Sequence, residues 1–154
     1  MALRQIVTEG DEILRKKARI VPEVDDRIRS ILDDMLETMR AECGVGIAAP
    51  QVGILKRMFI VETEDQFIEL INPEIIEMEG LQQEEEGCLS VPGVVGTVER
   101  PEYVKIKGLN RNGEEVIYEG RGLDAIAICH ENDHLDGILF IDKATDRRFL
   151  NEEQ

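Results

Sequence analysis

The chain has 154 residues, and 42% of its side chains are hydrophobic, which is enough to bury one core. We therefore expect a single domain spanning residues 1–154. The 33 acidic and 18 basic side chains give a formal net charge of −15 at pH 7. That charge repels nucleic-acid phosphates and anionic lipid headgroups, so we predict no direct nucleic-acid binding and no membrane partner.

No targeting or membrane segment is recognisable. The first residues lack the basic and then apolar stretches of a signal peptide, and no apolar run is long enough for a membrane span. The three cysteines, Cys43, Cys88 and Cys129, are an odd number, so a disulfide framework is not expected. We predict a cytoplasmic protein. The basic run at 15–19 is short and is expected to be a solvated turn or helix end.

The segment from Asp25 to Glu42 is predicted to form an amphipathic helix. Its apolar side chains recur at the three- and four-residue spacing of one helical face, and they are Ile28, Ile31, Leu32, Met35, Leu36 and Met39. The helix is expected to end at CGVGIAAPQVG, because the glycines and the proline of that stretch break helical continuity.

Short strands are predicted at 57–62 and 67–72, with Asn72-Pro73 ending the second strand. A polar, acidic stretch ending in Glu84-Glu85-Glu86 follows. The next two strand-like segments, 103–110 and 115–120, flank Arg111-Asn112-Gly113. Because Asn-Gly tolerates positive φ, this pattern predicts a β-hairpin.

A second helix is predicted to begin near Asp124 and to end near Gly137. Its first half contains Ile126-Ala127-Ile128 and is apolar nearly all round, which is typical of a helix buried inside a domain. The predicted fold class is therefore α+β. Antiparallel strands would pack around a central helix that carries an HExxH motif, together with an N-terminal amphipathic helix.

Both histidines of the chain, His130 and His134, lie in one five-residue frame, HENDH. Residues four apart share one face of a helix, so the two imidazoles can bind a single metal ion. Glu131 is rotated by about 100° from His130, where it can reach a metal-bound water instead of the metal. The frame therefore predicts a site for metal-assisted hydrolysis.

A catalytic tetrahedral site needs a third protein ligand, and Cys88 is the favoured candidate because thiolate binds zinc and ferrous iron well. A metzincin site would need a third histidine where this chain has Phe140. Glu152 and Glu153 lie in a polar tail whose ordering would be costly, so they are poor ligands. Two other thiols are unsuitable: Cys129 adjoins His130 and points elsewhere, and a buried, structural role is expected for Cys43.

Three separated stretches resemble the signature motifs of the peptide deformylases, in the same order and with similar separations. They are GVGIAAPQ at 44–51, EGCLS at 86–90 and HENDH at 130–134. The resemblance spans about residues 1–145. It implies a single catalytic domain and a hydrolase that removes the formyl group from the N-terminal formylmethionine of newly synthesised proteins and releases formate.

The resemblance implies one divalent metal ion, natively ferrous iron, with zinc, nickel or cobalt as substitutes. Its ligands would be Cys88, His130 and His134. The partners would be N-formylmethionyl peptides and nascent chains. A transient contact with the ribosome is a further expectation, although the tail after the third motif is shorter than in members that dock through a long basic helix.

The same resemblance assigns the remaining catalytic roles. Metal-bound hydroxide would attack the formyl carbon while Glu131 transfers the proton, and Gln51 with the N–H of Leu89 would stabilise the oxyanion. A preorganised amide N–H and the side-chain NH₂ of Gln51 are the kind of donors that this chemistry needs, because negative charge develops on the formyl oxygen. Glu86 and Arg100 resemble a supporting ion pair, which we interpret as scaffold.

Substrate-binding roles are expected at two places. The backbone of Gly44, Val45 and Gly46 can pair with a substrate main chain by strand addition. Ile126 and Ala127 match family positions that line the methionine pocket, with an ordinary core role as the alternative.

Two further functions fit parts of the pattern. The histidine frame alone also suits a metallopeptidase or another amidohydrolase. A structural metal site or a binding module is the non-enzymatic alternative, and it would need a fourth protein ligand.

Overall fold

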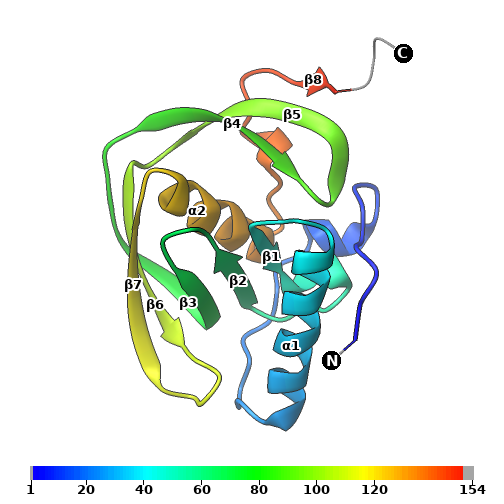
Figure 1. The fold of residues 1–154 in the computed structure, drawn as a ribbon, viewed down its shortest axis with the longest axis vertical. Helices are drawn as coiled ribbons and strands as arrows, with labels where there is room; N and C mark the ends of the chain where they lie inside the picture. The colour runs from blue at the N-terminus through cyan, green and yellow to red at the C-terminus, as the bar shows by residue number, and fades with distance from the viewer. Residues whose placement is uncertain (1, 151–154) are drawn as a thin grey trace.

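The structure is a computed structural model and describes residues 2–150. Figure 1 shows its elements. The α-helices are α1 (Asp26–Ala41) and α2 (Leu123–Leu135). The strands are β1 (Gly46–Ala48), β2 (Met58–Glu62), β3 (Phe67–Glu79), β4 (Gln82–Cys88), β5 (Val91–Arg100), β6 (Tyr103–Leu109), β7 (Glu115–Arg121) and β8 (Arg148–Phe149), and the 3-10 helices are η1 (Glu12–Arg15), η2 (Ala49–Val52) and η3 (Phe140–Asp142). Glu152 and Glu153 lie outside the described residues.

The strands form two antiparallel sheets. One has the order β1-β2-β3-β6-β7 and the other the order β4-β5-β8. In Figure 1, α2 lies between the two sheets, and α1 lies on the opposite side of the five-stranded sheet. The prediction of a mixed fold with two helices and antiparallel strands is confirmed, and its extent as a single domain over residues 1–154 stays a prediction. Neither helix is long and apolar enough to cross a membrane.

Strand β2 of the five-stranded sheet is buried on both faces. Successive side chains of a strand point to opposite faces. Phe59 and Val61 join the core cluster that contains α2, whereas Met58 and Ile60 join the cluster that contains α1. A third cluster packs β5 against η1 and η3, and its members are Leu14, Val91, Val98, Leu139, Phe140 and Ile141.

Helix α1 occupies the predicted amphipathic segment. The Asp25 carboxylate accepts a hydrogen bond from the backbone N–H of Ile28 at 3.0 Å, which caps the N-terminus. Beyond its last turn, Cys43 has a left-handed φ of 58°. The expectation that Cys43 is buried was wrong: the residue is exposed, because the chain reverses there to leave the helix.

Helix α2 is buried on every side over most of its length, as its apolar first half predicted. Its buried residues run from Asp124 to Glu131 and include His134 and Leu135. The guanidinium of Arg57 donates to the Leu135 carbonyl and to the Asp136 carboxylate, both at 2.9 Å. A cation at this position satisfies the free carbonyls and complements the negative end of the helix.

The predicted hairpin is formed by β6 and β7. Val104 and Ile106 are fully buried, and Lys105 and Lys107 on the other face are only partly buried. In the connecting turn Gly113 takes a φ of 79°. The hairpin prediction is therefore confirmed.

The prediction that Asn72-Pro73 ends the second strand was wrong, because β3 continues to Glu79. The pairing of β3 with β6 shifts register between Ile71 and Glu74, so the proline lies at a bulge where no ladder bond is required of it. Asn72 has a φ of 53°, and its amide side chain both donates to and accepts from the backbone of Val21.

The acidic stretch at 84–86 belongs to strand β4, which the sequence did not predict. Its side chains are mostly exposed, so no apolar alternation marks it. Pairing with β5 defines it instead, in a register that sets Gln82 opposite Arg100 and Glu86 opposite Gly96.

We predict that Gly137→Ala destabilises the protein by at least about 1 kcal/mol more than Gly113→Ala. Both glycines have φ between 75° and 79°, so both variants carry the left-handed backbone cost. Only at Gly137 would the new Cβ lie 2.5 Å from a backbone oxygen, that of Arg15. Urea unfolding of both variants measures the difference. Equal losses would show that the close approach at Gly137 relaxes without cost.

Candidate metal centre

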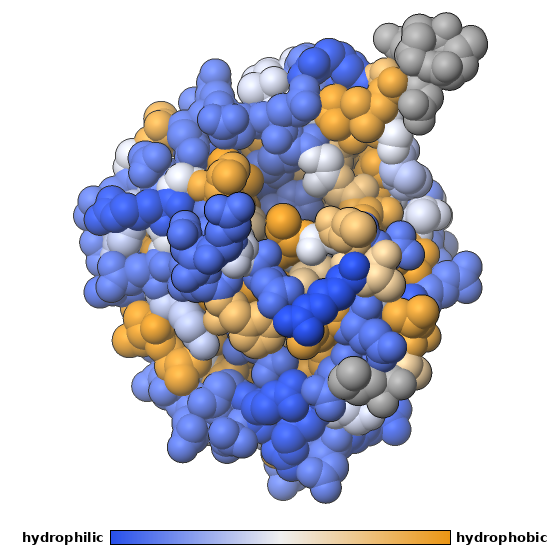
Figure 2. Space-filling model, in the orientation of Figure 1, coloured by the Kyte–Doolittle hydropathy of each residue, from blue (hydrophilic) through white to orange (hydrophobic). Residues whose placement is uncertain are grey.

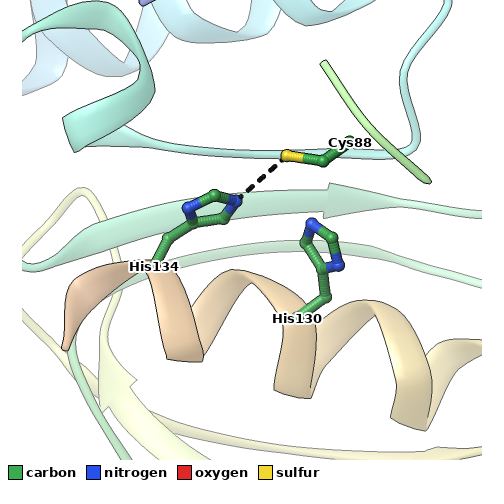
Figure 3. Close-up of side chains that lie close together, drawn as sticks. All are labelled: Cys88, His130 and His134. Atoms are coloured by element: carbon green, nitrogen blue, oxygen red, sulfur yellow. Dashed lines mark hydrogen bonds between the residues drawn. The ribbon is translucent and has the colours of Figure 1, made fainter. Parts of the chain in front are cut away.

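Three side chains from two elements converge on one point. His130 and His134 come from successive turns of α2, and Cys88 comes from the end of β4; Figure 3 shows both imidazoles extending toward the sulfur. One ligand atom from each of the three lies within 4.8 Å of the others. Cys88 Sγ is 3.4 Å from His134 Nε2.

The donor set fits a divalent transition metal ion. One sulfur and two imidazole nitrogens suit zinc or ferrous iron, and three protein ligands leave one position of a tetrahedron open. The Nδ1 atom of His134 is buried and bonds to no other described residue. Nε2 is therefore the ring nitrogen of His134 that lies near another potential metal ligand, the sulfur of Cys88.

Glu86 holds the other imidazole, which sequence reasoning did not foresee. Its Oε1 lies 2.9 Å from His130 Nδ1, so His130 Nε2 remains for the metal. Arg100 donates to both carboxylate oxygens, at 2.8 and 3.0 Å, so the expected ion pair is formed. The available signal was the resemblance of Glu86 and Arg100 to a supporting ion pair, together with the place of Glu86 two residues before Cys88.

The pKa values of this group follow from burial and hydrogen bonding. Burial would raise the pKa of Glu86, but hydrogen bonds from Arg100 and His130 outweigh it and lower this pKa to about 2. Burial would lower the pKa of His130, but hydrogen bonds to Cys88 and Glu86 raise it well above its usual value. For His134, burial and the charge of His130 lower the pKa. Glu86 is thus a permanent anion behind His130.

Glu131 is a buried carboxyl beside strand β1. Its Oε1 has no hydrogen-bond partner among the residues that the structure describes. Burial raises its pKa to about 7, so the group can hold or release a proton near neutral pH. A Cβ added at Gly46 would lie 2.5 Å from Glu131 Oε2, so only glycine leaves room for this carboxyl.

The two expected oxyanion donors lie beside Cys88. Gln51 is fixed by the N–H of Ala48, which donates to its Oε1 at 2.9 Å, and its Nε2 faces Cys88 Sγ at 3.6 Å and Ser90 Oγ at 3.2 Å. Leu89 lies in the turn between β4 and β5, and within residues 2–150 its N–H donates to no other residue. Ser90, which sequence reasoning missed, also donates its backbone N–H to the sulfur at 3.4 Å.

The expected substrate-binding backbone lies at the edge of the five-stranded sheet. The N–H of Glu62 donates to the Val45 carbonyl, so in the antiparallel register the peptide groups of Gly46 face away from β2. Val45 is 60% exposed. Figure 2 shows a hollow in this face of the molecule, below the β4 and β5 strands of Figure 1, with hydrophobic side chains at its rim.

The two expected pocket residues differ in their surroundings. Ile126 and Ala127 are both buried on α2. Ala127 belongs to the cluster between α2 and the five-stranded sheet, whereas Ile126 belongs to none of the three clusters in the described part of the chain. Ile126 therefore packs outside these clusters, and Ala127 is part of the core. Cys129 is also in this core, where burial raises its pKa to about 11.

Three side chains that could hold a metal ion lie next to a buried carboxyl, and this is the arrangement that metal-dependent hydrolases require. The sequence specifies the family further. A profile described as "Polypeptide deformylase" matches residues 3–149, and the chain belongs to that family. The resemblance noted from the three motifs is thereby confirmed.

Relatives and solved structures agree with this family. Peptide deformylase of Acetivibrio thermocellus is 56% identical over 154 residues, which is all of this chain and 89% of the relative. The crystal structure of peptide deformylase from Thermotoga maritima is similar with a TM-score of 0.91 at 39% identity, over 95% of this chain and 100% of that chain. That from Synechococcus elongatus in complex with actinonin has a TM-score of 0.89 at 43% identity, over 92% and 79% of the two chains.

We predict that Glu86→Gln lowers the affinity for a divalent metal ion by about 10- to 100-fold, because His130 loses its anionic partner. Competition with a chromophoric chelator measures this affinity. Glu85→Gln is the matched control, since Glu85 is exposed and pairs with Arg148. Equal affinities in the two variants would exclude the role of Glu86.

Proposed function

We propose that the protein removes the formyl group from the N-terminal formylmethionine of peptides and nascent chains, with release of formate. The observation that carries this proposal is the convergence of Cys88, His130 and His134 beside the buried Glu131, in a chain that belongs to the polypeptide deformylase family. Single residues are assigned their catalytic and binding roles on the basis of their contacts.

The proposed cofactor is one divalent metal ion, natively ferrous iron, with zinc, nickel or cobalt as substitutes. A thiolate and two imidazoles accept all of these ions, so the ligand set supports the group without selecting among them. When bound, such an ion polarises the formyl oxygen and activates a water molecule near neutral pH.

Glu131 is the proposed general base and then the general acid. Its pKa of about 7 means that the carboxylate can accept a proton from water and later donate it to the departing amine. Its Oε1 bonds to no described residue, so it is free to do both.

Gln51 and the N–H of Leu89 are the proposed oxyanion donors. The N–H of Ala48 fixes the orientation of the Gln51 amide, which leaves its NH₂ group directed at the region of Cys88. Donors that are held in place before the reaction stabilise the developing charge without reorganisation.

The free edge of β1 is the proposed binding site for the substrate main chain. A peptide added antiparallel to this edge would hydrogen-bond to Gly46 and neighbouring peptide groups, which accepts many sequences because side chains are not read there. The proposed pocket for the methionine side chain includes Ile126, with Val45 and Gly44 beside its entrance. Cytoplasmic location and contact with the ribosome stay predictions.

Formate release from formyl-Met-Ala-Ser by the anaerobically purified, iron-loaded protein tests the proposal. We expect Glu131→Gln, which keeps the shape but cannot transfer the proton, to lower the rate by about 10²-fold or more. Removal of the metal by a chelator should abolish release, and ferrous iron should restore it.

A folded, iron-loaded wild-type protein that releases no formate would overturn the proposal. Equal rates of attack on formylated and unformylated Met-Ala-Ser would favour the alternative of a general metallopeptidase instead.

We further predict that Gly46→Ala loses about 10²-fold in activity, because the new methyl group displaces the Glu131 carboxyl and small displacements of catalytic groups have effects of this size. Gly120→Ala is the matched control, since its Cβ would meet the movable end of Ile128, which has no assigned role, at 2.8 Å. The rate of formate release is compared at equal metal content. Similar losses in both variants would contradict the role given to the contact with Glu131.

A further inference from the structure

Arg100 is a buried cation that connects three elements. It lies on β5 and is 2% exposed. Its Nε and Nη2 donate to Glu86 on β4, and its Nη1 donates to Asp133 on α2 at 2.7 Å. All three of its nitrogen atoms therefore bond to carboxylates that belong to two different elements.

The two carboxylates differ in what they contact. Glu86 touches His130 and lies two residues before Cys88, so it belongs to the metal site already described. Among the described residues, the carboxylate of Asp133 pairs only with Arg100 and with Lys143, whose Nζ lies 3.1 Å away. It is within the HENDH frame, on the same helix as His130 and His134, and 14% of its side chain is exposed.

The ligands of the metal centre come from β4 and α2, so the site depends on how these two elements are placed against each other. No backbone ladder fixes that placement, because the two sheets are separate and β4 pairs only with β5 among the described strands. Few side chains of β4 are buried. Polar contacts therefore connect the sulfur-bearing strand to the histidine-bearing helix: Glu86 bonds directly to His130, and the bridge from Glu86 through Arg100 to Asp133 is a second connection.

We propose that Asp133 is a positioning residue of the metal centre, which holds Arg100 and thereby sets β4, with Glu86 and Cys88, against the two histidines of α2. This inference rests on the metal site of the proposed function. It assigns to Asp133 an effect on the ligands without contact with the metal, the substrate or the reacting atoms.

The environment of Asp133 argues for this role over a general contribution to stability. A buried guanidinium that loses one acceptor must turn toward another or leave a donor unpaired. Any such movement changes both hydrogen bonds to Glu86, because the guanidinium is a rigid plane. Lys143 cannot replace the bridge, since it is 44% exposed and reaches only Asp133.

The test measures Co²⁺ affinity by chelator competition and the thiolate-to-cobalt absorption of the loaded protein. Asp133→Ala should lower the affinity about tenfold, the lower end of effects seen for groups behind a ligand, and weaken the absorption band. Asp133→Asn should keep the affinity within about threefold of wild type, because its amide oxygen can still accept from Arg100.

The matched control is Asp136→Ala. Asp136 pairs with Arg57 just beyond the end of the same helix but touches neither Arg100 nor Glu86, so its loss should leave Co²⁺ affinity and the absorption band unchanged. Lys143→Met should behave like this control. Urea unfolding of every variant separates loss of stability from loss of metal affinity.

Two results would overturn the proposal. One is an Asp133→Ala variant that loses stability but keeps wild-type affinity and absorption. The other is an Asp136→Ala variant with the same loss of affinity as Asp133→Ala. Because formate release is not measured, failure of the proposed deformylase activity would not affect this outcome.

Discussion

A guanidinium in the protein interior is tolerated only when anions surround it, and this constraint organises the metal centre. Arg100 satisfies it by bonding to Glu86 and Asp133 at 2.7 to 3.0 Å. The apolar clusters hold α1 and α2 to the five-stranded sheet, but they contain little of β4. Charge pairing therefore helps to hold β4 in place, whereas apolar packing holds the two helices.

The site lies where elements with different tasks meet. Helix α2 supplies two imidazoles and a carboxyl from a buried support, the end of β4 supplies the sulfur, and the turn after β4 supplies the N–H of Leu89. Strand β1 approaches the helix so closely that only glycine fits opposite Glu131. Its outer edge pairs with no other strand in the described part of the chain. One short strand thus both covers the carboxyl and carries the edge proposed for the substrate backbone.

Local sequence patterns predicted those elements that form because of periodicity or turn residues within the element itself. The periodicity of Ile28 to Met39, the apolar start of α2 and the Asn-Gly turn each match an observed element. Strands β4 and β5 were not predicted, because acidic side chains and glycines hide them and only pairing with each other defines them. The extension of β3 through Asn72-Pro73 needs a bulge and two hydrogen bonds to Val21, which are far away in the sequence.

In the site, too, features set by local sequence could be predicted, whereas features set by distant contacts could not. The histidine frame and the cysteine could be predicted, since spacing on a helix and ligand chemistry are local properties. The contact of Glu86 with His130 could not, because it joins residues 44 positions apart. The different surroundings of Ile126 and Ala127 also depend on how the helix is rotated against the sheet, which the sequence of a helix buried on all sides does not reveal.

The separation of the ligands along the chain has a consequence for folding. Cys88 and His134 are 46 positions apart, and β5, β6 and β7 lie between them. A cation bound by both segments would close that stretch into a loop, much as a cross-link does, and would penalise the open chain by the entropy of closing it. Occupancy of the centre would then add to the free energy of unfolding, because the ion is held only where both segments are assembled.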